Sequence, residues 1–247
     1  MFVYPPAVKQ EALALVAAGE NDCEVARSLA IPRTTVRDWR RRLASATPAD
    51  LCPRCWRRGS GITFTAEDYA ELLGLYLGDG HITALARTDR LCISLDARYP
   101  GIAGDSEALL RRCFSSNRVG RLAADGGATV VLWVYSRHLS CLFPQHGPGK
   151  KHERAIVLEA WQQQPVEAAP WAFLRGCIRS DGCVFVNRTS RYQYLTYDFC
   201  NRSADIRALF IEACGAAGVV CRAAGDRVRI NTRADVARLR EHVGIKV

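Results

Sequence analysis

Two rhythms of apolar residues alternate along residues 62–247. Helical stretches repeat apolar positions every three or four residues, whereas strand stretches alternate apolar and polar residues one by one. The predicted helices cover residues 66–77, 104–114, 136–143, 152–163, 203–217 and 232–242, with one more from residue 170, and the predicted strands cover residues 81–85, 91–95, 119–123, 129–135, 183–187, 194–200, 219–223 and 227–231. The order helix, strand, strand, helix, strand, strand, helix occurs twice, so we predict an α+β fold of two pseudo-symmetric units with antiparallel sheets. Residues 228–230 are expected to match residues 131–133.

Two stretches break the helical pattern in the same way. Residues 72–80 read LLGLYLGDG, and residues 174–182 read LRGCIRSDG. Glycine inside a helix costs about 1 kcal/mol relative to alanine, and a carboxylate in the last turn faces the negative end of the helix dipole. The two stretches lie 102 residues apart, which indicates a duplicated unit. We place the unit boundaries at 62–165 and 166–247.

Small residues share one side of each of these helices, namely Gly74 and Gly78 in the first and Gly176 and Ser180 in the second. Without bulky side chains there, the two helices can approach backbone to backbone across a pseudo-two-fold axis. Their carboxyl ends then bring Asp79 and Asp181 close together. Packing alone would not require an acid at both places, so the aspartates indicate a chemical role.

Residues 1–45 show helical spacing alone, with predicted helices at 7–18, 23–29 and 33–43. Their shared core is expected to contain Val25, Leu29, Val36 and Trp39. The third helix begins with the run TTVRDW, which resembles the helix-turn-helix of transposases and resolvases. The resemblance implies that an exposed face enters the major groove of DNA through Arg33, Thr34, Thr35 and Arg37, and that phosphates are met by Arg40, Arg41 and Arg42.

Composition supports a nucleic-acid partner. The formal net charge is +9 and the sequence pI is about 9.2, and arginine suits the recognition of phosphate and guanine. The chain opens without a signal peptide, and no run of about 18 apolar residues predicts a membrane span. The 11 cysteines lack the spacing of a disulfide framework, so we expect reduced thiols in a cytoplasmic protein.

Residues 46–61 have the composition of a linker, rich in proline and glycine. Cys52 and Cys55 form a C-x-x-C pair, which is half of a structural zinc site. No second pair follows within the next 20 residues, so the tetrahedron is not completed locally. Either Cys23 supplies a third ligand or the pair is a relic of a zinc site.

The paired motifs and the repeated element order resemble the LAGLIDADG homing endonucleases, in the form that carries two motifs in one chain. The resemblance covers residues 65–247 and implies two saddle-shaped sheets whose concave face lies along the major groove. The outward strand positions would then contact DNA: His81, Thr83, Arg87, Arg90 and Arg121 in the first unit, and Arg188, Arg191, Tyr192, Asn201, Arg202, Arg227 and Arg229 in the second.

The same resemblance implies a Mg²⁺ site with Asp79 and Asp181 as catalytic carboxylates and with the residues before them, Gly78 and Ser180, as further ligands. Each unit is also expected to supply a basic residue that steadies the charge on the phosphate. Lys151 and Lys246 fit this role, with Lys150 as an alternative to Lys151. Arg179 is expected to pair with Asp181 and to weaken its hold on the metal.

These observations predict a monomeric, metal-dependent endonuclease that cuts double-stranded DNA at a specific site. Two alternatives stay open. Some bacterial sporulation regulators join a degenerate copy of this fold to a helix-turn-helix, which would make the chain a DNA-binding regulator without catalysis. Related proteins also act as RNA-splicing maturases, and a basic surface would serve RNA as well.

Overall fold

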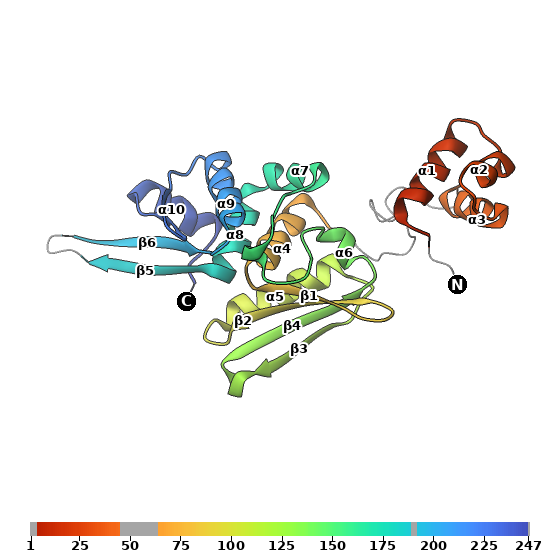
Figure 1. Ribbon diagram of the computed structural model, residues 1–247. Helices are drawn as coiled ribbons and strands as arrows, with labels where there is room; N and C mark the ends of the chain where they lie inside the picture. Colours follow the sequence, from red (N-terminus) through yellow and green to blue (C-terminus); the bar gives the residue numbers. More distant parts are fainter. Residues whose placement is uncertain (1–3, 45–63, 189–191, 247) are drawn as a thin grey trace. The chain divides into compact units, whose positions relative to one another are not determined.

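The computed structural model describes residues 4–44, 64–188 and 192–246, apart from the side chains of Pro6 and of residues 42–44 (Figure 1). The chain divides into two compact units, Met1–Gly61 and Ile62–Val247, and each is described by itself. No helix within the described residues is long and apolar enough to cross a lipid bilayer.

The first unit contains α1 (Pro6–Ala17), α2 (Asp22–Ser28) and α3 (Arg33–Ala44). Asn21 begins α2, because its side chain accepts hydrogen bonds from the main-chain N–H groups of Cys23 and Glu24. The carboxylate of Glu24 accepts the N–H of Asn21 in return. The predicted core is confirmed, since Val25 and Val36 are fully buried and Leu29 and Trp39 pack against them.

The second unit repeats one order of elements. Its first half contains α4 (Ala66–Asp79), β1 (Gly80–Ala84), β2 (Asp89–Asp96), α5 (Pro100–Cys113), β3 (Val119–Ala124), the short 3₁₀ helix η2 (Asp125–Gly127), β4 (Thr129–Ser136), α6 (Leu139–Leu142) and the 3₁₀ helix η3 (Lys151–Glu153). After the linking helix α7 (Ala160–Ala168), its second half contains α8 (Pro170–Asp181), β5 (Gly182–Arg188), β6 (Gln193–Cys200), α9 (Ala204–Ala216), β7 (Arg222–Ala224), β8 (Arg227–Ile230) and α10 (Arg233–His242). The predicted α+β class is confirmed.

Each half builds one four-stranded antiparallel sheet. The strand orders are β1-β2-β4-β3 and β5-β6-β8-β7, so the two sheets have the same topology. In Figure 1, α8, α9 and α10 lie on one side of β5 and β6, and the other side carries no helix. Buried residues such as Leu132 and Val228 point to the helical side and join a single hydrophobic core. We call the opposite side of each sheet its open face.

The register corrects the predicted match between the halves by one residue. Gly80 lies opposite Ile93, which lies opposite Leu132. In the second half, Gly182 lies opposite Phe199, which lies opposite Val228. Residues 228–230 therefore match residues 132–134, not 131–133. The difference matters because a shift of one residue exchanges the two faces of a strand.

The predicted helix over residues 152–163 is wrong. Residues 154–159 have no helical structure, and α7 begins only at Ala160. Ile156 and Leu158 are buried whereas Val157 is 71% exposed, which is the alternation of an extended chain. Glu159 then caps α7 together with Gln162. The apolar residues of this segment fit either helical or extended spacing. The extended form is adopted because only one side of the segment packs against the core.

Candidate active site

Helices α4 and α8 pack against each other through glycines. A Cβ placed on Gly176 would lie 2.2 Å from the carbonyl oxygen of Glu71, and a Cβ placed on Gly74 would lie 2.6 Å from that of Phe173. Both distances are far below van der Waals contact, so no larger residue fits while the backbones keep this separation. The predicted close approach of the two helices is confirmed.

Gly78 and Ser180 make the next contact toward the helix ends. A Cβ on Gly78 would lie 2.1 Å from the Ser180 Oγ. That hydroxyl donates to the carbonyl oxygens of Gly176 and Cys177 in its own helix, at 3.0 Å each. Ser180 therefore fills the space beside Gly78, and its hydroxyl is used within α8. Its main-chain oxygen, rather than its side chain, is the group that could serve as a ligand.

The two aspartates end the two helices and converge, as predicted. The Asp181 Oδ2 lies 3.1 Å from the Cβ position of Gly78, so this carboxylate reaches the end of α4. Burial, and then the charge of Asp181, raise the pKa of Asp79 to about 6. Burial also raises the pKa of Asp181. Two carboxylates in this position favour a cation between them.

Asn201 holds one of the two aspartates. Its Nδ2 donates to the Asp181 Oδ2 at 2.6 Å, and this bond opposes the rise in the pKa of Asp181 that burial causes. Leu95, at the matching position of the first half, cannot donate such a bond to Asp79. Its amide nitrogen is thus used to position Asp181, and the predicted DNA contact of Asn201 stays a prediction.

One lysine lies at the C-terminal end of each of the helices α4 and α8. The Lys151 Nζ donates to the carbonyl oxygens of Tyr76, Leu77 and Gly78, at 2.5, 2.9 and 2.6 Å. The Lys246 Nζ donates to the carbonyl oxygen of Ser180 at 2.7 Å. The two lysines thus occupy matching places, each at the negative end of one helix dipole.

Both ammonium groups lie within the field of the aspartates. Burial lowers the pKa of Lys151 to about 8, and the charges of Asp181 and Asp79 oppose that shift. Burial also lowers the pKa of Lys246, again against the two aspartates. Lys150, the alternative, is exposed and lies near Glu153 instead. Lys151 is therefore the lysine that the structure brings to the carboxylates.

The oxygen atoms gathered here fit a hard divalent cation. They are the two carboxylates and the main-chain carbonyls of Gly78 and Ser180, which already accept hydrogen bonds from the cationic lysines. Within the described residues, no group of three or more His, Cys, Asp or Glu side chains could hold a metal ion. Mg²⁺ is commonly bound by one or two carboxylates together with water and substrate phosphate, and the two aspartates could supply those carboxylates.

Arg179 does not pair with Asp181, so that prediction is wrong. Its guanidinium donates to Glu71 on α4 at 2.6 Å and to Asp105 on α5 at 2.6 Å. Glu71 also accepts from Arg175 at 2.9 Å. The acidic character of Asp181 is therefore not neutralised by its neighbour in the motif.

The open face of the first sheet carries three of the predicted DNA contacts. His81, Thr83 and Arg90 alternate with the buried Ile82 and Leu91 and so point away from the helices. Arg87 is exposed in the turn between β1 and β2. The predicted placement of Arg121 on the open face is wrong. Arg121 lies opposite the buried Leu132 and forms an ion pair of 3.1 Å with Glu107 on α5. Its side chain is on the helical side.

The second sheet presents Arg227 and Arg229 on its open face, where both form ion pairs with Asp198. Arg188 lies on the same side of β5 as Val184, which packs against the core, and not on the open face. It is exposed because it stands at the end of the strand. Tyr192 and Arg202 are exposed just before β6 and α9. Arg191 lies outside the described residues.

In the first unit, the exposed residues of the predicted DNA contacts are Arg33, Thr34, Arg37, Arg40 and Arg41, and Thr35 is half-buried. Arg40 forms an ion pair of 3.2 Å with Asp22 on α2, so it stabilises the unit as well as adding positive charge. The side chain of Arg42 lies outside the part of the chain that the structure describes. The same holds for Cys52 and Cys55, so the predicted zinc site stays a prediction.

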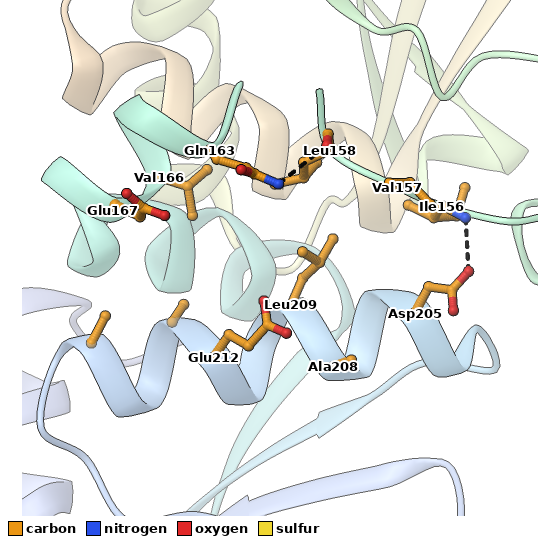
Figure 2. A pocket seen from close by; sticks show the side chains of 12 residues that line it. Ile156, Val157, Leu158, Gln163, Val166, Glu167, Asp205, Ala208, Leu209 and Glu212 are labelled. Atoms are coloured by element: carbon orange, nitrogen blue, oxygen red, sulfur yellow. Dashed lines mark hydrogen bonds between the residues drawn. The ribbon is translucent and has the colours of Figure 1, made fainter. Parts of the chain in front are cut away.

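A cavity of about 560 Å³ lies between α9 and the segment that leads into α7 (Figure 2). Two of its four polar side chains bond to its own walls: the Asp205 carboxylate accepts the N–H of Ile156 at 2.8 Å, and the Gln163 amide donates to the Leu158 carbonyl at 3.4 Å. The remaining lining is largely apolar and contains none of the converging acids or lysines. We assign no chemistry to this cavity.

Comparisons with known proteins give matches to both parts of the chain. Residues 6–51 match a family described as a homeodomain-like domain. A search of curated proteins finds no match. Among solved structures, the chain is similar to the N-terminal LAGLIDADG domain of DUF199/WhiA, with 15% sequence identity, a TM-score of 0.47, and coverage of 81% of this chain and 88% of that one.

The chain is also similar to mesophilic variants from the homing endonuclease I-DmoI, with 14% identity, a TM-score of 0.48, and coverage of 72% of this chain and 96% of that one. A structure of I-DmoI in complex with DNA and Mn gives 15% identity, a TM-score of 0.46, and coverage of 72% and 97%. The chain thus matches a homeodomain-like family at its N-terminus and is similar in fold to solved LAGLIDADG and homing-endonuclease structures.

Proposed function

We propose that this chain is a metal-dependent endonuclease that hydrolyses phosphodiester bonds of double-stranded DNA. One observation carries the proposal: Asp79 and Asp181 converge at the ends of two helices that pack through Gly74 and Gly176. Burying two carboxylates together is unfavourable for folding, as the raised pKa of Asp79 indicates. Because this burial destabilises the fold, the pair is expected to serve in binding or catalysis.

Asp79 and Asp181 would hold the divalent cation, together with the main-chain oxygens of Gly78 and Ser180. When bound, a divalent cation supplies Lewis-acid stabilisation of the charge on the reacting phosphate. Asn201 would keep the Asp181 carboxylate in one orientation through its 2.6 Å hydrogen bond. Such supporting contacts commonly affect metal affinity about tenfold or more.

Lys151 and Lys246 would turn from the helix ends to the substrate. Both ammonium groups donate to carbonyl oxygens, and a phosphate oxygen is a more strongly charged acceptor than a carbonyl. With a pKa of about 8, Lys151 is mostly protonated at neutral pH. The two lysines would therefore add positive charge where negative charge develops on the phosphate.

DNA would lie along the open faces of the two sheets. His81 and Arg90 would contact it from the first sheet, and Arg227 and Arg229 would contact it from the second. The exposed arginines of α3 would bind a further stretch of duplex in its major groove. A single chain supplies both halves of the site, which is why we propose that it acts as a monomer.

One observation favours a second candidate, a DNA-binding regulator without catalysis. Two aspartates and two lysines meet at the helix ends, and the lysines already donate to the Gly78 and Ser180 carbonyls that a metal ion would use. The two ammonium groups supply positive charge beside the carboxylates, as a metal ion would. A regulator would bind duplex through the same faces and leave it intact.

Cleavage of a randomised duplex library separates the two candidates. Wild-type protein is expected to produce double-strand breaks with Mg²⁺ and none with EDTA, and Asp79→Asn/Asp181→Asn is expected to produce none in either. Asp125→Asn, an exposed change in the β3–β4 turn, is the matched control and should cleave like wild type. Binding without cleavage in every sample would establish the regulator, and binding to RNA alone would leave the maturase alternative.

A further inference from the structure

Asp198 is a buried carboxylate on the open face of the second sheet. It lies near the C-terminal end of β6 and points away from the helices, because its neighbours Tyr197 and Phe199 fill the core on the other side. Its side chain is 0% exposed, and its Oδ1 accepts no hydrogen bond from the described residues. A buried charge with one unpaired oxygen destabilises a fold, so a role in function is the better explanation.

The arginines that cover Asp198 remain accessible. The Arg227 NH1 donates to the Asp198 Oδ2 at 2.6 Å, and the Arg229 Nε approaches the same oxygen at 3.5 Å. The two arginine side chains are 45% and 48% exposed. Each guanidinium is thus held at one nitrogen, and its other nitrogens form an edge that donates to no group among the described residues. Arg227 keeps its Nε and NH2, and Arg229 keeps its NH1 and NH2.

A free guanidinium edge with two parallel N–H donors matches the O6 and N7 atoms of guanine in the major groove. Discrimination requires that the arginine be fixed, because a mobile side chain can reach a phosphate or another base equally well. Asp198 cannot touch a base itself, since it is fully covered. Its position allows it to fix two arginines at once.

The first sheet lacks this arrangement. By strand register, Cys92 takes the place of Asp198, and Trp133 takes the place of Arg229. Asp198 also lies opposite Cys183, two residues beyond Asp181. The charged cluster is therefore confined to one half of the molecule and lies beside the converging aspartates.

From this geometry we propose that Asp198 is a positioning residue for sequence specificity, which directs Arg227 and Arg229 at guanines in the half-site under the second sheet. The inference rests on the proposed DNA-binding function and adds a stated base preference to it. The half-site under the first sheet has no such requirement, so the preferred target is asymmetric, with guanine selected on one side of its centre.

The test selects preferred duplexes by binding of the full chain in Ca²⁺ and then replaces each selected guanine with 7-deazaguanine, which lacks N7. Wild-type affinity is expected to fall about tenfold at one or two guanines on one side of the site. Asp198→Asn is expected to lose this sensitivity while its affinity for random duplex stays equal or rises, because one negative charge is removed. Cys92→Ser, at the matching position, should keep the wild-type sensitivity.

Thermal unfolding of each variant guards against misfolding. If Asp198→Asn does not fold, Arg227→Gln/Arg229→Gln keeps the carboxylate and must lose the same guanine sensitivity. The inference is overturned if Asp198→Asn retains the guanine preference, or if wild type binds duplex with no preference for N7. Cleavage by a protein without guanine preference would leave the proposed nuclease standing, so the two failures are distinguishable.

Discussion

Arg179 donates to Glu71 at 2.6 Å across the contact between α8 and α4. Glu71 is 4% exposed and also accepts from Arg175, so one acid on the first motif helix holds two arginines of the second. The pairs fix the rotation of the helices about each other, and the positions of Asp79 and Asp181 depend on that rotation.

Removal of this acid should destabilise the protein. Glu71→Ala leaves two partly buried arginines without their partner, and we expect a loss of about 3 kcal/mol in the free energy of unfolding, measured by urea denaturation. Glu67→Ala is the control, because the Glu67 side chain is 67% exposed in its pair with Arg175. A loss for Glu67→Ala as large as that for Glu71→Ala would refute the assignment.

The glycine contact gives a second prediction. Gly176→Ala places a methyl group 2.2 Å from the Glu71 carbonyl, so the helices must separate, and we expect a loss of at least about 2 kcal/mol in stability together with loss of cleavage. Gly215→Ala, in α9, meets nothing within 4 Å and should be neutral or stabilising by up to about 1 kcal/mol. Equal thermal unfolding of the two variants would contradict the close packing.

The raised pKa of Asp79 predicts how stability depends on pH. The folded state holds the Asp79 proton up to a pKa of about 6, against an ordinary pKa of 3.8, so this group favours folding below about pH 4. That contribution is lost as pH rises through 6. Asp79→Asn should therefore be more stable than wild type in EDTA at pH 7.5, by on the order of 2 kcal/mol, and the gain should vanish near pH 4. A pH-independent difference in unfolding free energy would rule out this origin.

Asn201 offers a test of support for the metal site against DNA contact. Asn201→Ala removes the 2.6 Å hydrogen bond to Asp181, and we expect the Mg²⁺ concentration for half-maximal cleavage to rise about tenfold. Duplex affinity in EDTA should change less than about twofold, because no base or phosphate contact is removed. A large loss of affinity in EDTA with an unchanged Mg²⁺ requirement would show instead that Asn201 contacts DNA, as the sequence predicts.

Much of the architecture follows from spacing alone. Gly74, Gly176 and the two aspartates break helix rules at matching places, and such violations require a tertiary cause that the packed pair supplies. Strand alternation likewise placed His81 and Thr83 on the open face. The positions of Lys151 and Lys246 were predicted from the family resemblance, and the structure brings both to the helix ends.

Other features depend on partners far along the chain. Nothing near Arg121 in sequence shows that Glu107 on α5 will pair with it, and the buried Leu132 opposite it decides its face. Asp198 is a single acid inside a strand, and its pairs with Arg227 and Arg229 require the β6–β8 register. The sequence signal for this cluster is the single charge of Asp198 among the apolar residues of β6, which is typical of a buried ion pair.

The central claim is that Asp79 and Asp181 form one divalent-metal centre, and Mn²⁺ binding measured by electron paramagnetic resonance tests it most directly. Wild-type protein with bound duplex should remove free Mn²⁺ from solution, as should Asp125→Asn. Asp79→Asn/Asp181→Asn should lose that binding while still holding the duplex. Equal Mn²⁺ binding by wild type and the double variant would contradict the claim.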